Sequence, residues 1–102
     1  MSKALQAAID LIADPARWTA HATARGADGE PVNIRSRFAV CWSAWGAMEK
    51  KNVSGLKQGR VDAYCRIVFM DGLSDTNDGD DGHGRAIEAM KEVQDGWWEG
   101  EE

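Results

Sequence analysis

The stretch Phe38-Ala39-Val40-Cys41-Trp42-Ser43-Ala44-Trp45-Gly46-Ala47-Met48 carries the clearest apolar stripe of the chain. Four large side chains recur in it at helical spacing: Phe38, Cys41, Trp45 and Met48. Ser36 or Asn33 can cap such a helix. Lys50 and Lys51 stand near its end, where the helix dipole favours cations. The pattern therefore predicts a helix over residues 36–51 with one face in the core.

Three further helices are predicted around this one. The first runs from Ser2 to about residue 13 and ends at Asp14-Pro15, because the residue before a proline leaves the helical region. Pro15 can open a short turn of its own. The others are predicted over residues 56–71 and 85–94. The apolar residues that define the three faces are Leu5, Ala8, Ile9 and Ile12, then Val61, Tyr64, Cys65, Val68 and Phe69, and finally Ile87, Met90 and Val93.

The remaining segments indicate turns and loops. Asp28-Gly29 is typical of a tight turn, which predicts a small β-hairpin near residues 20–34, with Pro31 keeping its second strand at an edge. Residues 74–84, rich in glycine and aspartate, are predicted to form a loop. We expect a mainly α fold: one domain of residues 1–102, a compact bundle of about four helices with the hairpin, and a frayed acidic tail at 97–102.

The net charge of −5 is unevenly distributed over the 102 residues. Residues 1–70 hold 10 basic and 6 acidic residues, whereas residues 71–102 hold 2 basic and 11 acidic residues. An acidic surface repels phosphates, so direct nucleic-acid binding through this third is disfavoured. The same field attracts a protein partner that carries a basic surface.

Composition also indicates the cellular compartment in which the protein is expected. No apolar run approaches the length of a membrane span, and the N-terminal residues lack the pattern of a signal peptide. Two cysteines, Cys41 and Cys65, do not make a disulfide framework. We therefore expect a cytoplasmic protein with reduced thiols that does not bind membranes.

Residues 75–83 raise the alternative of a small metal-dependent protein or enzyme that uses Asp78, Asp80, Asp81 and His83. Read as a calcium loop from Asp75, the segment lacks the glycine at its sixth position and the glutamate at its twelfth. His21, Cys41, Cys65 and His83 lack the short paired spacing of zinc ligands. We expect neither a cofactor nor enzymatic activity.

A second alternative is a DNA-associated regulator that uses Arg35 and Arg37 at the start of the predicted helix. Trp97 and Trp98, in the acidic tail, point about 100° apart on a helix, so both cannot extend the core stripe. An exposed tryptophan among glutamates is typical of an interaction hot spot.

Several segments occur in an order that resembles a known family. They are Ala13-Asp14-Pro15-Ala16-Arg17-Trp18, the segment Ala24 to Val32, the stretch Phe38 to Met48, and Asn77-Asp78 followed by His83. The chain resembles a family of small uncharacterised proteins found in bacteriophage and actinobacterial genomes. That family usually has a cysteine where this chain has Ser43. The resemblance implies a phage or mobile-element accessory protein.

The function expected from these observations is a non-enzymatic, phage-type protein that binds and inhibits a host protein machine, as an anti-CRISPR inhibitor does. Its partner would be a host protein or complex with a basic surface. The expected docking residues lie in the acidic C-terminal third: Asp75, Asp78, Asp80, Asp81, Trp98, Glu99, Glu101 and Glu102.

Overall fold

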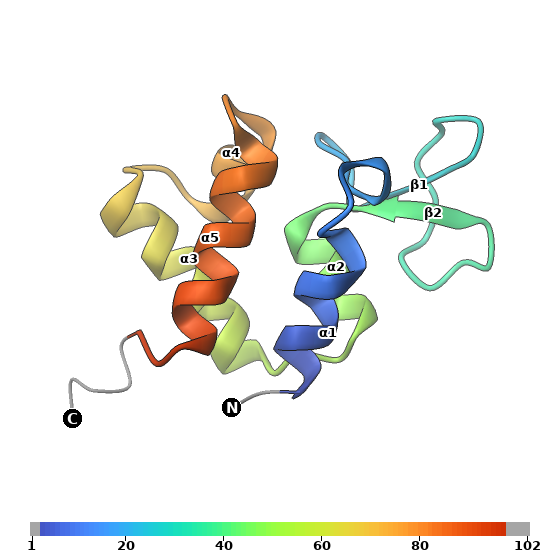
Figure 1. The fold of residues 1–102 in the computed structure, drawn as a ribbon. Coiled ribbons are helices and arrows are strands. Elements are labelled where there is room, and N and C mark those ends of the chain that lie inside the picture. Colours follow the sequence, from blue (N-terminus) through green and yellow to red (C-terminus); the bar gives the residue numbers. More distant parts are fainter. Residues whose placement is uncertain (1–2, 98–102) are drawn as a thin grey trace.

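The computed structural model describes residues 3–97, which form a mainly α fold with one small antiparallel sheet (Figure 1). The elements in chain order are α1 (Lys3–Ile12), the 3-10 helix η1 (Pro15–Arg17), β1 (Ala24–Gly26), β2 (Ala39–Trp42), α2 (Ala44–Lys50), α3 (Gly55–Val68), α4 (Leu73–Asp78) and α5 (Gly82–Gln94). The sheet lies at one end of the helices (Figure 1). The expectation of a mainly α chain with a small two-stranded element is confirmed.

The core lies between α1, α2, α3 and α5. Helix α1 packs against α2 and α5, and α3 packs against α5. The largest fully buried apolar side chains come from all of these helices: Leu5, Ile12, Met48, Val61, Met90 and Val93, with Leu73 added by α4. The apolar spacing predicted the buried faces of α1 and α5, because a period near 3.6 residues places such side chains on one side of a helix. On α3 the prediction is confirmed for Val61, Tyr64 and Cys65 but is wrong for Val68, which is exposed.

The prediction of a continuous helix over residues 36–51 is wrong in its first half. Residues 39–42 form strand β2, and α2 begins only at Ala44. The hydroxyl of Ser43 accepts a hydrogen bond from the backbone N–H of Gly46, so Ser43 caps α2. Residues 39–42 form a strand because their backbone pairs with β1, with Ala24 opposite Trp42, a long-range contact that side-chain spacing does not reveal.

The predicted turn at Asp28-Gly29 and a short hairpin around it exist, and β1 has a second strand partner that the sequence did not predict. Gly29 N–H donates to the carbonyl of Gly26 at 2.9 Å, and an isolated bridge joins Arg25 to Pro31. The longer pairing of β1 is with β2, antiparallel, with Ala24 opposite Trp42. Asn33 and Ser36 accept from the backbone N–H groups of Arg35 and Phe38, so they close turns instead of capping a helix.

The prediction of a loop over residues 74–84 is also wrong, because Leu73–Asp78 form α4 and α5 already begins at Gly82. The Asp62 carboxylate on α3 accepts from the backbone N–H of Leu73 at 2.8 Å, which satisfies an end of α4 that its own sequence leaves uncapped. Tertiary contacts therefore hold a helix in a segment of poor helix formers.

Two further observations concern the ends of the chain and the membrane prediction. Trp97 packs edge-on against Tyr64, with ring centroids 5.2 Å apart, and its backbone N–H donates to the carbonyl of Glu92. Trp98, Glu99, Glu101 and Glu102 lie outside the described residues. Within residues 3–97, every helix is too short or too polar to cross a membrane.

Candidate functional site

Asn77 fixes the geometry of a polar site where α4, α2 and the segment after η1 meet. Its side chain is 1% exposed and uses all of its hydrogen-bonding capacity. The amide oxygen accepts from Trp18 Nε1 at 2.8 Å and from Ala44 N at 3.0 Å. The amide nitrogen donates to the carbonyl of Thr19 at 3.1 Å and to Asp78 Oδ1 at 3.0 Å. One side chain thus joins three segments.

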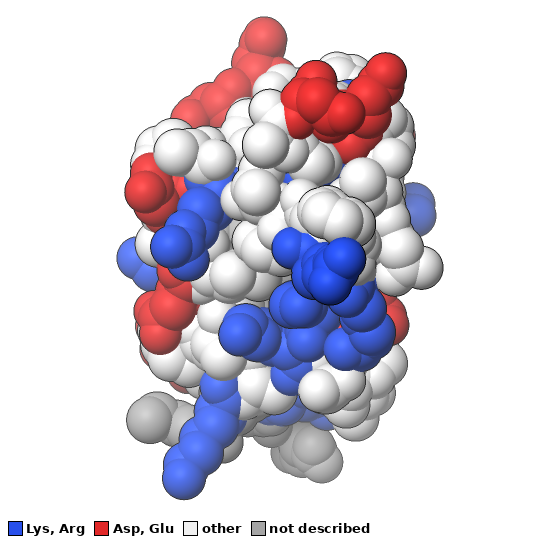
Figure 2. Space-filling view, turned by 90° about the vertical axis from the view of Figure 1, so that its right-hand side faces the viewer, with Lys and Arg blue, Asp and Glu red and all other residues white. Residues whose placement is uncertain are grey.

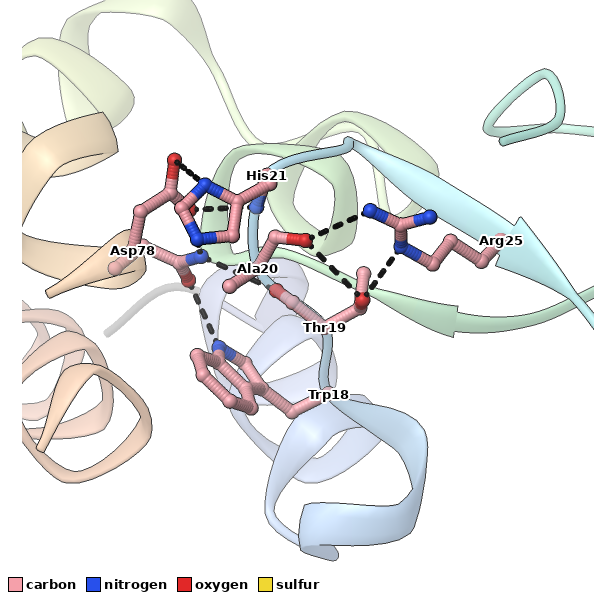
Figure 3. Close-up of polar contacts among 7 residues, drawn as sticks. Trp18, Thr19, Ala20, His21, Arg25 and Asp78 are labelled. Atoms are coloured by element: carbon pink, nitrogen blue, oxygen red, sulfur yellow. Dashed lines mark hydrogen bonds and ion pairs between the residues drawn. The ribbon is translucent and has the colours of Figure 1, made fainter. Parts of the chain in front are cut away.

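Asp78 lies beside His21 at this junction (Figure 3). Its Oδ1 accepts from the backbone N–H of His21 at 2.8 Å, and its Oδ2 lies 3.6 Å from His21 Nδ1. His21 has a φ of 65°, a left-handed conformation that is uncommon for a residue other than glycine. The hydrogen bond from the His21 N–H to the Asp78 carboxylate stabilises this backbone conformation.

A cleft of about 230 Å³ opens at the same junction. Its walls come from the segment after η1, the N-terminal turn of α2, and α4: His21, Ala22, Thr23, Ser43, Trp45, Ser74, Asn77 and Asp78. The walls lie close together because α2 has a glycine, Gly46, in its first turn. A Cβ on Gly46 would lie 2.0 Å from the carbonyl oxygen of Thr23, so only glycine fits there.

Four of the expected acidic residues, Asp75, Asp78, Asp80 and Asp81, lie in α4 and in the turn before α5, whereas the expected glutamates lie outside the described residues. The C-terminal end of α3, all of α4 and the N-terminal end of α5 lie together (Figure 1). Residues 71–85, which we call the acidic end, contain five aspartates and one arginine. Asp75, Asp80 and Asp81 are exposed and Asp78 is half-buried. Among the described residues, the carboxylates of Asp80 and Asp81 form no hydrogen bond or ion pair.

The side chains proposed for a metal site do not converge. His83 Nε2 lies 2.6 Å from the carbonyl oxygen of Ile12, and its ring packs against Trp18 at 5.4 Å between centroids. Asp78 instead faces His21. Over residues 3–97, no group of three histidine, cysteine or carboxylate side chains is arranged to hold a metal ion.

Lysine and arginine side chains gather on the side of the molecule where β1 and β2 lie (Figure 2). The two arginines expected at a helix start are not placed there. Arg35 donates to the carbonyls of Glu49 and Lys50 at the end of α2. Arg37 lies over the ring of Phe38 at 5.0 Å. Arg35 therefore stabilises the C-terminus of α2, and its guanidinium is occupied by these carbonyls instead of being free to contact DNA.

A surface that the sequence did not predict lies at the C-terminal end of α3. Met70 is 84% exposed, Ile67 58% and Val68 46%. We call these three residues the apolar corner. Their exposure could have been inferred from the run Ile67-Val68-Phe69-Met70, because four consecutive apolar residues cannot all lie on one helix face. Asp71 follows this corner directly, and Asp75 lies close enough to Arg66 to interact with its charge.

The two cysteines occupy different environments. Cys65 is buried on α3, and burial raises the pKa of its thiol to about 11. Tyr64 beside it donates to Glu88 at 2.8 Å, and burial together with this bond raises the pKa of its hydroxyl to about 12. Cys41 on β2 is half-buried. A buried thiol that keeps its proton is a poor nucleophile, so Cys65 acts as a core residue.

Comparison with known proteins gives no relative. No protein-family model matches the chain, and no curated protein or solved structure matches it significantly.

Proposed function

We propose that this protein is a non-enzymatic binding protein that covers a surface of another protein, as expected for a phage-type inhibitor of a host machine. The proposed interface joins the apolar corner to the acidic end. Protein interfaces commonly have an apolar centre and a polar rim. Here Ile67, Val68 and Met70 supply the centre, and Asp71 and Asp75 lie in the rim.

The observation that carries this proposal is the conformation of Met70. Its φ is 65°, directly after the end of α3, where glycine is the usual residue. A side chain in this conformation costs about 1 kcal/mol relative to glycine. The methionine side chain is 84% exposed, so it gives the fold little packing in return. Unfavourable backbone conformations that hold an exposed side chain in place cluster at functional sites.

The distribution of charged side chains supports a partner with a basic surface. The carboxylates of Asp80 and Asp81 remain available to a partner, since no described residue pairs with them. The lysine and arginine side chains gather on the side of β1 and β2 instead (Figure 2). This separation orients a basic partner toward the acidic end and accelerates its association.

The experiment is an affinity capture from the lysate of an actinobacterial host, with three variants run in parallel. We expect a captured protein with a basic surface that Met70→Gly and the double variant Asp80→Asn/Asp81→Asn both lose. Glu30→Gln removes an exposed charge in the turn between β1 and Pro31, so it should retain the captured protein. A protein retained equally by all three variants would refute the proposed interface.

A further inference from the structure

Asp78 has one carboxylate oxygen that the fold leaves open. Oδ1 accepts two hydrogen bonds, from His21 N and from Asn77 Nδ2. Oδ2 accepts none from the described residues, because His21 Nδ1 at 3.6 Å is too distant. The side chain is 31% exposed and lines the cleft. The fold therefore fixes the orientation of the carboxylate and leaves one oxygen for a donor from outside.

The other walls of the cleft suit a flat, positively charged donor. The Trp45 indole supplies an aromatic ring, and the hydroxyl groups of Ser43 and Ser74 supply acceptors. No lysine or arginine is among the lining residues. Arginine pairs with carboxylates through parallel N–H groups and stacks on aromatic rings, which a lysine ammonium cannot do in the same way.

We propose that this cleft receives the guanidinium group of an arginine side chain on the partner protein. The inference rests on the proposed function and deepens it, because it names an anchor residue type on the basic surface. Asp78 is the last residue of α4, so the cleft adjoins the acidic end. The guanidinium donates to Asp78 Oδ2 and stacks on Trp45, while Ser74 accepts a further N–H.

Two cationic groups of the chain itself could compete for this position. Arg25 does not, because its guanidinium donates to Thr19 Oγ1 and to the carbonyls of Ala20 and Gly29 (Figure 3). A protonated His21 would pair with Asp78. The binding experiment is therefore run at pH 8 to limit this competition.

The test titrates the full chain with N-acetyl-arginine amide and, separately, with the uncharged isostere N-acetyl-citrulline amide. NMR signals of the Trp45 indole and of the backbone N–H groups of residues 21–23 report occupancy. We expect saturable shifts with the arginine probe and binding of the citrulline probe that is weaker by about tenfold or more, since only the former forms a charge-assisted pair. Absence of saturable shifts, or equal affinity for both probes, would overturn the inference.

Variants locate the interaction. Asp78→Asn keeps an oxygen that can accept the His21 N–H, and it should weaken binding of the arginine probe by about tenfold. Asp80→Asn, outside the cleft, should not change it. If Asp78→Asn fails to fold by circular dichroism, the comparison of the arginine and citrulline probes on the wild-type chain still decides the inference.

The result of the arginine-probe experiment can be distinguished from the result of the partner-capture experiment that tests the proposed function. Met70→Gly should lose the captured partner but bind the arginine probe with unchanged affinity, because Met70 does not line the cleft. Failure of the arginine probe with successful, Met70-dependent capture overturns the cleft inference alone. Failure of Met70-dependent capture overturns the proposed function.

Discussion

The indole N–H of Trp18 donates to the amide oxygen of Asn77 at 2.8 Å, across 59 residues of sequence. The same oxygen accepts the first backbone N–H of α2, from Ala44. This pair therefore fixes where η1, α2 and α4 lie relative to one another, and with them the walls of the cleft. An asparagine is required because it alone offers an acceptor and two donors at this length.

Asn77→Ala should lower the free energy of unfolding by about 2–4 kcal/mol, since it leaves several buried polar groups without partners. Urea denaturation followed by tryptophan fluorescence measures this change. Asn33→Ala is the matched control, because Asn33 is exposed and its side chain accepts one hydrogen bond among the described residues, from the N–H of Arg35. A loss below 1 kcal/mol for Asn77→Ala would show that the junction does not organise the fold.

Alanine substitutions at two helical glycines should change the stability of the fold in opposite directions. A Cβ on Gly46 would meet the carbonyl of Thr23 at 2.0 Å, so Gly46→Ala must displace α2 or the segment that leads into β1. A Cβ on Gly59 meets nothing within 4 Å, and Gly59→Ala in α3 should stabilise by about 0.5–1 kcal/mol through helix propensity. Thermal denaturation of both variants checks this; a stabilised Gly46→Ala would contradict the close approach.

Met70→Gly should raise the stability of the free protein by about 1 kcal/mol or less, because it relieves the left-handed backbone. Met70→Ala keeps the positive φ without the long side chain, so it should be close to wild type in stability. Differential scanning calorimetry measures both. A clear destabilisation by Met70→Gly would mean that the methionine packs on the fold and is not held out for a partner.

The stability of the fold should decrease above pH 9. The pKa of Cys65 rises from 9.0 to about 11, and that of Tyr64 from 10.0 to about 12 on folding. Unfolded chains lose these protons at lower pH than folded ones, so alkaline conditions favour unfolding. The contribution is complete below pH 9 and is lost as the pH rises to about 11 for Cys65 and about 12 for Tyr64.

Urea denaturation at pH 8, 9, 10 and 11 measures this decrease. Cys65→Ala removes one of the two groups and should make the decrease less steep. A thiol reagent at pH 8 provides an independent check, since it should modify Cys41 much faster than the buried Cys65. Equal modification rates, or a stability that is constant to pH 11, would contradict the burial of Cys65.

The sequence predicted the parts of the fold that local periodicity determines. Leu5 to Ile12 and Ile87 to Val93 repeat at helical spacing, and their helices are found where expected. The spacing of Phe38, Cys41 and Trp45 is equally helical, yet Phe38 and Cys41 precede α2 and lie in or beside a strand. Periodicity alone could not reveal that residues 24–26 would pair with residues 39–42, because that choice depends on long-range contacts.

The candidate site was predicted only in part. The aspartates were found from composition, but no sequence pattern indicated that Asp78 would contact His21 or Asn77 would contact Trp18, since each pair is more than 50 residues apart. Helix α4 was missed because serine, aspartate and asparagine disfavour helices, and Asp62 on another helix supplies the stabilising contact. Buried polar networks of this kind depend on tertiary structure.

The measurement that tests the central claim most directly is the dissociation constant of the purified captured partner for wild type and for Met70→Gly. We expect the variant to bind at least about tenfold more weakly, as for loss of an interface hot spot, while its melting temperature is unchanged or higher. Equal dissociation constants for the two proteins would contradict the assignment of the apolar corner as the centre of the interface.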